Sequence, residues 1–138
     1  MVGIGPGSPL DRTRRAEQAI RESEVVVGYK RYLDLIPDLT AGKELVSSGM
    51  TAETERCREA LALAARGKKV ALVSSGDPGV YGMAGLAIEL AEAEKIEVPI
   101  NIIPGVTAAT AAAAALGAPL MLDFACISLS DLLVPWEE

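Results

Sequence analysis

Glycine and proline recur in three short segments of the sequence, 3–7, 74–79 and 104–107, each at or just after an apolar run. Glycine lets a ligand approach bare backbone closely and proline stiffens the turn, so such segments suit a polar nucleoside. In the second segment Asp77 can also accept hydrogen bonds from a hydroxyl or an ammonium group. An ordinary turn, in which Asp77 caps the following helix, is the alternative interpretation.

The first segment departs from the common nucleotide-binding fingerprints. Ser8 stands where a dinucleotide-binding loop has its third glycine, and Pro6 removes a backbone donor. The second predicted strand ends at Gly28 and Tyr29, so no acidic residue follows it to bind a ribose. The sequence also contains no Gly-Lys-Ser or Gly-Lys-Thr phosphate loop. A tight turn without any ligand is the simpler alternative for this segment.

Other reactive side chains are few. Carboxylates of an anionic substrate could pair with basic residues that follow two predicted strand ends, unless these only form solvated helix faces: Arg12, Arg14, Arg15, Lys30 and Arg31. The chain has no histidine, which excludes Ser-His-Asp and Cys-His nucleophile pairs and leaves no metal site to expect. Cys57 and Cys126 lie far apart, and we expect them to be small core residues, not nucleophiles or a disulfide.

Short β-branched runs alternate with helical patterns along most of the chain. Strands are predicted at 1–4, 25–28, 44–46, 70–73 and 100–103. Helices are predicted at 13–22, 29–36, 52–65 with Thr51 as its cap, 81–94 and 106–116. Parallel neighbours need crossover helices, so this order predicts an α/β fold with a five-stranded, mainly parallel sheet flanked by helices. The three glycine-containing segments would then share the carboxyl edge of the sheet, where such folds bind ligands.

The last part of the chain carries weaker signals. The alanine-rich helix at 106–116 offers little bulk, so we expect it to pack tightly against a neighbour. Gly-Ala-Pro punctuation at 117–119 predicts a first domain over residues 1–118. A new strand at 125–128 would then open a truncated second domain over 119–138.

Composition narrows the function classes. Half of the 138 residues are apolar, which is enough for a domain with its own core. A net charge of -6 disfavours nucleic acid and anionic membranes as partners. No apolar run approaches the roughly 20 residues that cross a bilayer. With two isolated cysteines, these features predict a reducing, cytoplasmic setting.

Taken in order, the three segments resemble the signature of the tetrapyrrole methylase family, which has a Gly-x-Gly-Pro-Gly start, a Gly-Asp-Pro loop and a Pro-Gly-Val/Ile-Thr/Ser segment. The longer strings at 27–30, 74–85 and 127–136 resemble the branch that methylates C17 of precorrin-3B or its cobalt analogue. The resemblance covers the whole chain, but only the amino-terminal half of the two-domain architecture of the family. It therefore implies the fold of the amino-terminal tetrapyrrole methylase domain.

The resemblance implies an enzyme that uses S-adenosylmethionine, releases S-adenosylhomocysteine and methylates an anionic tetrapyrrole, precorrin-3B or cobalt-precorrin-3, while the macrocycle contracts. It implies a cofactor site made of Pro6, Ser75, Gly76, Asp77, Val80, Thr107 and Ala108. Methyl transfer from a sulfonium needs alignment more than a catalytic side chain, which suits a chain without histidine. In the family a second domain closes the cleft and contributes to a homodimer. The chain alone is therefore expected to fold, bind the cofactor weakly and be inactive.

Ring contraction also requires proton transfers, for which some relatives are thought to use an aspartate at the end of the second strand. This chain has Tyr29 at that place, so Tyr29 and the adjacent Lys30 are the candidate catalytic residues. Packing of Tyr29 against the edge of the sheet is the structural alternative.

Two other functions fit the same segments. One is another methyltransferase of the superfamily, acting at a different position of the macrocycle, on rRNA or on a protein residue. The acidic balance of the chain disfavours RNA. The other is a nucleotide-binding or regulatory module without catalysis.

Overall fold

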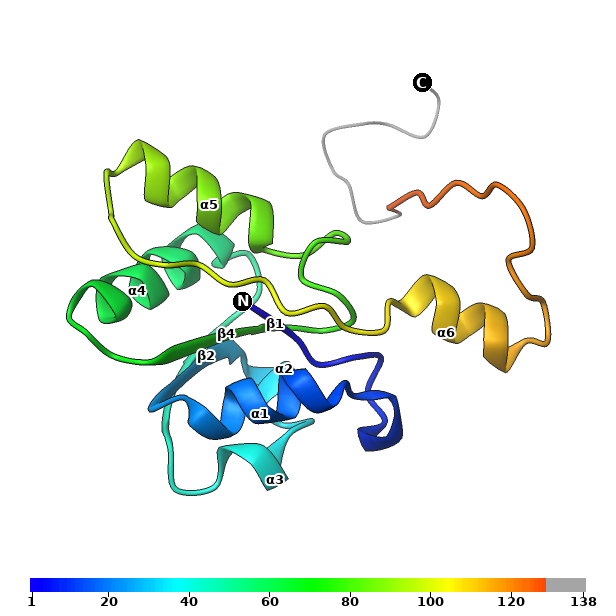
Figure 1. Ribbon diagram of the computed structural model, residues 1–138, viewed down its shortest axis with the longest axis horizontal. Coiled ribbons are helices and arrows are strands. Elements are labelled where there is room, and N and C mark those ends of the chain that lie inside the picture. Colours follow the sequence, from blue (N-terminus) through cyan, green and yellow to red (C-terminus); the bar gives the residue numbers. More distant parts are fainter. Residues whose placement is uncertain (129–138) are drawn as a thin grey trace.

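The computed structural model describes residues 1–128, which build a parallel four-stranded sheet (Figure 1). The strand order is β1-β4-β2-β3, with bounds β1 Val2–Gly3, β2 Val25–Tyr29, β3 Glu44–Ser48 and β4 Val70–Ser74. In the register of the central strand, Val26 lies between Leu45 of β3 and Ala71 of β4. All four strands therefore end at the same edge of the sheet.

Helices cover both faces of the sheet, as the run of three buried valines in β2 requires. Figure 1 places α1 and α3 on one face and α4 and α5 on the other. The helix bounds are α1 Arg14–Glu22, α2 Lys30–Leu33, α3 Pro37–Thr40, α4 Glu53–Ala65, α5 Ala84–Ala93 and α6 Ala108–Ala115. Val26 packs with Ile20 on the first face, whereas Val25 and Val27 pack with Cys57 on the second. None of the helices within residues 1–128 is long and apolar enough to cross a membrane.

The predicted fifth strand, 100–103, does not form a ladder. Ile103 makes one parallel bridge to Val2, in which the N–H of Ile103 donates to the carbonyl of Met1 at 2.9 Å and the N–H of Gly3 donates to the carbonyl of Ile103 at 3.0 Å. The next N–H on this side of the segment, that of Gly105, donates to the carboxylate of Asp77 and not to β1, so the pairing does not extend. The segment thus lies beside β1 as expected, although the prediction of five strands was wrong.

The observed helix boundaries differ from the predicted ones at a proline and at two residues with positive φ. Pro37 does not stop a helix but begins α3, where its missing N–H costs nothing. Thr51 does not cap α4, because its φ is 60° and its hydroxyl donates to the carbonyl of Met50. Tyr81, with a φ of 50°, keeps α5 from starting before Ala84.

The carboxyl-terminal part of the described chain differs most from expectation. Helix α6 has no buried residue and projects from the body of the molecule (Figure 1), so the expected tight packing is absent within residues 1–128. The predicted strand at 125–128 is not formed, because no neighbouring strand within the described part of the chain lies there to pair with it. The rest of the predicted second domain, 129–138, lies outside the described residues.

Candidate functional site at the carboxyl edge of the sheet

The three glycine-containing loops meet at one edge of the sheet. Gly5 and Gly76 pair in an isolated bridge, with N–H to carbonyl distances of 3.1 Å from Gly5 and 2.7 Å from Gly76. The N–H of Gly105 donates to the carboxylate of Asp77 at 3.0 Å. These contacts confirm the expectation that loops far apart in sequence share the carboxyl ends of the strands.

The loops approach so closely that side chains would not fit between them. A Cβ on Gly3 would lie 2.5 Å from the carbonyl oxygen of Gly76 and 2.8 Å from Cδ of Pro78. A Cβ on Gly105 would overlap the same carbonyl oxygen of Gly76. Gly76 also has a φ of 60°, which side chains rarely tolerate. The bare backbone at this edge is therefore required by the structure itself.

Asp77 ties two of the loops together. Its Oδ1 accepts from the N–H of Gly79 at 2.8 Å, and its Oδ2 accepts from the N–H of Gly105 at 3.0 Å. Because α5 starts only at Ala84, Asp77 does not cap that helix, although its bond from the N–H of Gly79 makes the ordinary turn of that alternative. Its carboxylate instead positions the loop that follows β4 against the loop that precedes α6.

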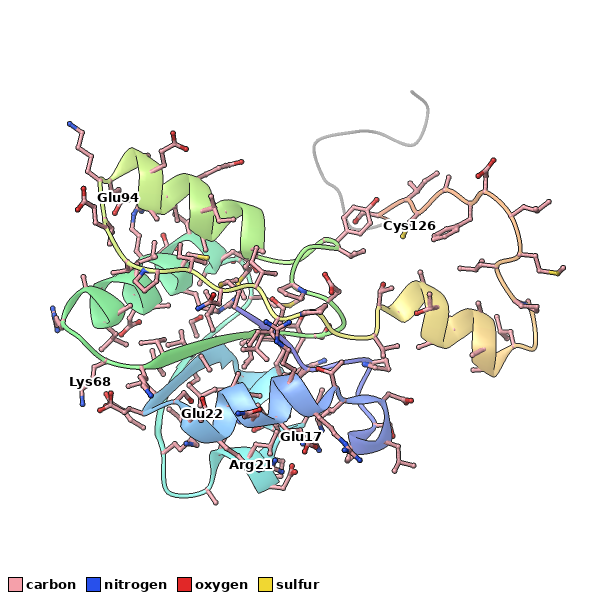
Figure 2. All side chains as sticks on the ribbon, viewed as in Figure 1. Glu17, Arg21, Glu22, Lys68, Glu94 and Cys126 are labelled. Atoms are coloured by element: carbon pink, nitrogen blue, oxygen red, sulfur yellow. The ribbon has the colours of Figure 1, made fainter. Side chains whose placement is uncertain are left out.

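A cavity of about 300 Å³ opens beside these loops. Six of the seven residues predicted to bind the cofactor line it: Ser75, Gly76, Asp77, Val80, Thr107 and Ala108. The seventh, Pro6, is exposed and does not line the cavity, although the neighbouring Gly5 pairs with Gly76. Cys126, labelled in Figure 2, also lines the cavity, and its carbonyl accepts from the hydroxyl of Tyr81 at 2.6 Å.

Ser74, the last residue of β4, begins the segment 74–79 but was not among the residues predicted to bind the cofactor. The residue lines the cavity, and its buried hydroxyl has no hydrogen-bond partner among residues 1–128. An unsatisfied buried polar group costs about 1–3 kcal/mol, which a polar ligand in the cavity would recover. The orphan hydroxyl and the bare glycine backbone together fit a polar nucleoside such as S-adenosylmethionine.

The two candidate catalytic residues lie near the cavity but do not line it. The ring of Tyr29 packs edge to face on that of Tyr32, with centroids 5.2 Å apart, and Tyr32 does line the cavity. Lys30 is exposed and forms an ion pair with Asp34 at 3.5 Å. Tyr29 thus lies one ring away from the cavity.

Arg56 is a second residue that sequence reasoning missed. It lines the cavity, although its side chain is only 3% exposed. Nε donates to Oγ of Ser48 at 2.8 Å, Nη2 donates to the carbonyl of Gly49 at 2.7 Å, and the guanidinium lies 5.9 Å from the Tyr29 ring centroid. Its place beside Cys57 on the buried stripe of α4 was the signal available in the sequence.

The basic residues that follow the first strand do not reach the cavity. Arg12 forms a bidentate pair with Asp38, with its Nη1 2.9 Å and its Nη2 3.1 Å from the carboxylate oxygens. This hydrogen-bonded guanidinium lowers the pKa of the Asp38 carboxyl. Arg14 is exposed, and Arg15 borders a hollow on the opposite edge. Arg12 therefore pairs with a carboxylate of the chain itself and does not line the cavity.

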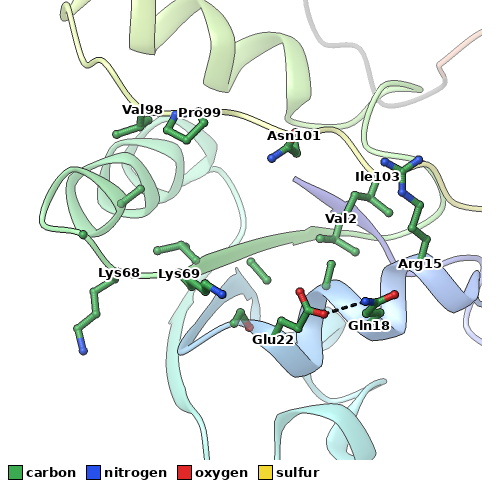
Figure 3. A pocket seen from close by; sticks show the side chains of 16 residues that line it. Val2, Arg15, Gln18, Glu22, Lys68, Lys69, Val98, Pro99, Asn101 and Ile103 are labelled. Atoms are coloured by element: carbon green, nitrogen blue, oxygen red, sulfur yellow. Dashed lines mark hydrogen bonds between the residues drawn. The ribbon is translucent and has the colours of Figure 1, made fainter.

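A larger hollow, of about 800 Å³, lies at the amino-terminal edge of the sheet (Figure 3). Val2 and Val70, at the starts of β1 and β4, line it together with charged side chains of both signs: Arg15, Glu22, Lys68 and Lys69. Lys68 pairs with Glu24 at 3.4 Å. Among residues 1–128, no buried side-chain polar atom without a partner lines this hollow.

The cysteines have different surroundings. Cys57 is buried in the core, and burial raises the pKa of its thiol. The expectation of a core residue is therefore confirmed for Cys57. It is wrong for Cys126, which is exposed although it lines the cavity.

Comparison with known proteins places this site in a family. The family model of the tetrapyrrole (corrin/porphyrin) methylases matches residues 1–138. The "Probable cobalt-factor III C(17)-methyltransferase" of Salmonella typhimurium is 53% identical over 136 residues, which are 99% of this chain and 56% of that protein. The "Precorrin-3B C(17)-methyltransferase" of a Sinorhizobium species is 45% identical over 140 residues, 99% of this chain and 55% of that protein.

Solved structures of similar proteins support the same family. The crystal structure of the methyltransferase CobJ superposes with a TM-score of 0.89 at 43% identity and covers 99% of this chain and 57% of its own. A uroporphyrin-III C-methyl transferase from Thermus thermophilus, in complex with S-adenosylhomocysteine, has a TM-score of 0.62 at 32% identity and covers 80% and 49%. The chain thus spans about half the length of these relatives. It belongs to the tetrapyrrole (corrin/porphyrin) methylases.

Proposed function

We propose that the protein is an S-adenosylmethionine-dependent methyltransferase of cobalamin biosynthesis. Its reaction would methylate C17 of precorrin-3B, or of its cobalt-bearing counterpart, with contraction of the ring. The observation that carries the proposal is the meeting of three glycine-containing loops beside one cavity, lined by the orphan hydroxyl of Ser74. The names of the relatives that match nearly the whole chain support the choice of reaction.

The chain offers the methyl donor mainly backbone and small side chains. Ser75, Gly76 and Ala108 line the cavity with little bulk, and Val80 adds an apolar wall. The hydroxyl oxygen of Thr107 accepts from the N–H of Ala109 at 3.3 Å, and its O–H group would still be available to donate to a ligand. These residues would hold the donor in one orientation without taking part in bond making.

S-adenosylmethionine would supply an electrophilic methyl group on sulfur, and its transfer to carbon depends chiefly on distance and alignment. Asp77 serves this alignment, because it fixes the separation of the loops at Gly79 and Gly105. The absence of histidine from the chain is compatible with such chemistry.

Proton transfer during ring contraction is assigned to Tyr29 and Lys30 as a prediction. Tyr29 is half-buried behind Tyr32, so it would act at the border of the cavity. If the variant Tyr29→Phe, made in a version that spans the full length of the relatives, turns over tetrapyrrole as fast as that version without the substitution, this role is wrong. Lys30→Gln tests the second candidate in the same way.

We also infer that the protein forms a homodimer and that it acts in the cytoplasm. Apolar side chains that follow α6, Leu116, Met121, Leu122 and Phe124, are exposed, and such surface favours association with a second copy. Light scattering of the purified chain tests the dimer, and a monomer at all concentrations would contradict it.

Ligand-dependent thermal stability provides the first test. S-adenosylhomocysteine should raise the unfolding temperature of the full chain, because a ligand at 100 times its Kd stabilises by about 2.7 kcal/mol. NAD and ATP, at matched concentrations up to the millimolar range, should leave it unchanged. Equal stabilisation by all three would support a general nucleotide-binding module instead.

The second test addresses the reaction itself. A version that spans the full length of the relatives is incubated with labelled S-adenosylmethionine and tetrapyrrole precursors with and without cobalt, and mass spectrometry follows the products. A product with one added methyl and a contracted ring is expected. A methyl added at another position, or to protein or RNA, would assign the chain to a different branch of the family.

A further inference from the structure

Arg56 carries a buried charge that the described residues compensate only in part. Its guanidinium has five N–H groups, and the oxygen acceptors within hydrogen-bond distance are Oγ of Ser48 and the carbonyl of Gly49. Nη1 lies 3.3 Å from the weak acceptor Sδ of Met83 and 3.9 Å from the carboxylate of Glu53. Because burying a cation is costly unless it is paired, this arrangement favours an additional anionic partner.

The same cavity contains the other incompletely satisfied group of the site. The hydroxyl of Ser74 has no hydrogen-bond partner among residues 1–128, and both Ser74 and Arg56 are buried residues that line the cavity. A hydroxyl and a guanidinium N–H are both donors. Together they match an anion with two oxygen atoms.

The charge of the surrounding residues indicates which anion fits. Glu53 and Asp77 also line the cavity, so two carboxylates stand near any bound group. A phosphate, with up to two negative charges, would be repelled more strongly than a singly charged carboxylate. A carboxylate also makes short, strong hydrogen bonds with a guanidinium.

We propose that Arg56 and Ser74 form a carboxylate-binding subsite in the buried wall of the cavity. This inference rests on the proposed function, in which two ligands bring carboxylates to the site. One is the amino-acid end of the methyl donor, and the other is an acidic side chain of the macrocycle. Arg56 acts here as a specificity-determining residue and takes no part in bond making.

The test measures the affinity of the protein for three probes and does not depend on turnover. The probes are S-adenosylhomocysteine, its decarboxylated analogue, and uroporphyrin III as a macrocycle with carboxylate side chains. Arg56→Met removes the charge, Arg56→Lys keeps it, and Ser74→Ala removes the orphan hydroxyl with little change of volume. Arg58→Met is the matched control, because Arg58 lies on the same helix but is half exposed and pairs with Glu94 at 2.6 Å, away from the cavity. Circular dichroism and thermal melts show which variants fold.

Arg56→Met should lower the affinity for one of the carboxylate ligands by about 10- to 100-fold, as expected for the loss of a charge-assisted hydrogen bond. Ser74→Ala should lower the affinity for the same ligand by about 3- to 10-fold. If the affinity for S-adenosylhomocysteine falls and that for its decarboxylated analogue does not, the subsite binds the donor. If only uroporphyrin III is affected, the subsite binds the macrocycle. Arg58→Met should leave all three affinities unchanged.

The inference is overturned if the folded variants bind every probe as the parent chain does. It is also overturned if the decarboxylated analogue loses as much affinity as S-adenosylhomocysteine while uroporphyrin III is unaffected, because Arg56 would then act only through the structure. Should Arg56→Met fail to fold, Ser74→Ala decides by the same criteria. A parent chain that binds S-adenosylhomocysteine or uroporphyrin III, with every folded variant binding each probe equally well, refutes the subsite alone. A parent chain that binds none of the probes refutes the proposed function as well.

Discussion

The amino-terminal edge of the sheet carries a hollow of about 800 Å³, and the carboxyl-terminal edge carries a cavity of about 300 Å³. The larger one is lined by solvated charges of both signs, such as Glu22 and Lys68, and by no orphan polar atom among residues 1–128. The smaller one has interleaved glycine backbone, the orphan hydroxyl of Ser74 and the buried guanidinium of Arg56. Volume alone would therefore favour the amino-terminal edge as the site, whereas unsatisfied groups and bare backbone favour the carboxyl ends of the strands.

The largest expected effect comes from placing a methyl group among the loops of the carboxyl edge. Gly3→Ala would bring Cβ within 2.5 Å of the Gly76 carbonyl, so we expect a loss of about 3 kcal/mol in the free energy of unfolding. Binding of S-adenosylhomocysteine should be lost as well. Urea denaturation and calorimetric titration measure both quantities.

The matched control lies at the other edge. Gly67 has a φ of 85°, and a Cβ added to it would meet no atom within 4 Å, so Gly67→Ala should cost only about 1 kcal/mol of backbone strain. Its affinity for S-adenosylhomocysteine should equal that of the parent chain. Equal losses in the two variants would mean that the two edges do not differ in the way described.

A smaller effect is expected when the link between two loops is removed. Asp77→Ala leaves the N–H groups of Gly79 and Gly105 without their acceptor, which should cost about 2 kcal/mol of unfolding free energy. Affinity for S-adenosylhomocysteine should fall with it, and Asp77→Asn, which keeps one acceptor oxygen, should lie between. An affinity unaffected by Asp77→Ala would show that loop separation does not control binding.

Chemical labelling distinguishes the two hollows without any mutation. Iodoacetamide should modify the exposed Cys126 before the buried Cys57, whose thiol has a raised pKa. S-adenosylhomocysteine should slow the modification of Cys126 several-fold, because this residue lines the smaller cavity. Acetylation of Lys68, at the opposite edge, should be unaffected by the ligand, and mass spectrometry of peptides reports both sites. Protection of Lys68 instead of Cys126 would place the ligand in the larger hollow.

The smallest effect concerns acid stability at the amino-terminal edge. The N–H of Lys69 donates to Glu24 at 2.9 Å, and this hydrogen bond, with a contribution from the Lys68 side chain, lowers the pKa of the Glu24 carboxyl. Such a group stabilises the fold above its unfolded pKa, near the ordinary value of about 4.3, and this contribution is lost as the pH falls through the lower folded pKa. Glu24→Gln should therefore lower the melting temperature slightly at neutral pH, and the difference should vanish in acid. A difference that persists in strong acid would contradict the assigned cause.

Several parts of the fold followed from local sequence. The three valines of β2 could only be a buried parallel strand, and Thr13 caps α1 through a hydrogen bond from the N–H of Ala16, at the predicted start of the helix. Six residues expected at the cofactor site line one cavity, since parallel strands deliver their following loops to one edge. The cap of α4 and the start of α5 were missed, because Thr51 and Tyr81 adopt positive φ, which their residue types do not indicate.

The sequence by itself determined which segments lie at the carboxyl edge, because strand polarity and glycine content are local properties of the chain. Only the tertiary structure decided which charges reach the cavity. Arg12 pairs with Asp38, which is distant in sequence, and does not line the cavity. Arg56 lines the cavity because α4 packs on the sheet. A long side chain goes where partners from other elements satisfy it, and those partners are set by packing across tens of residues of sequence.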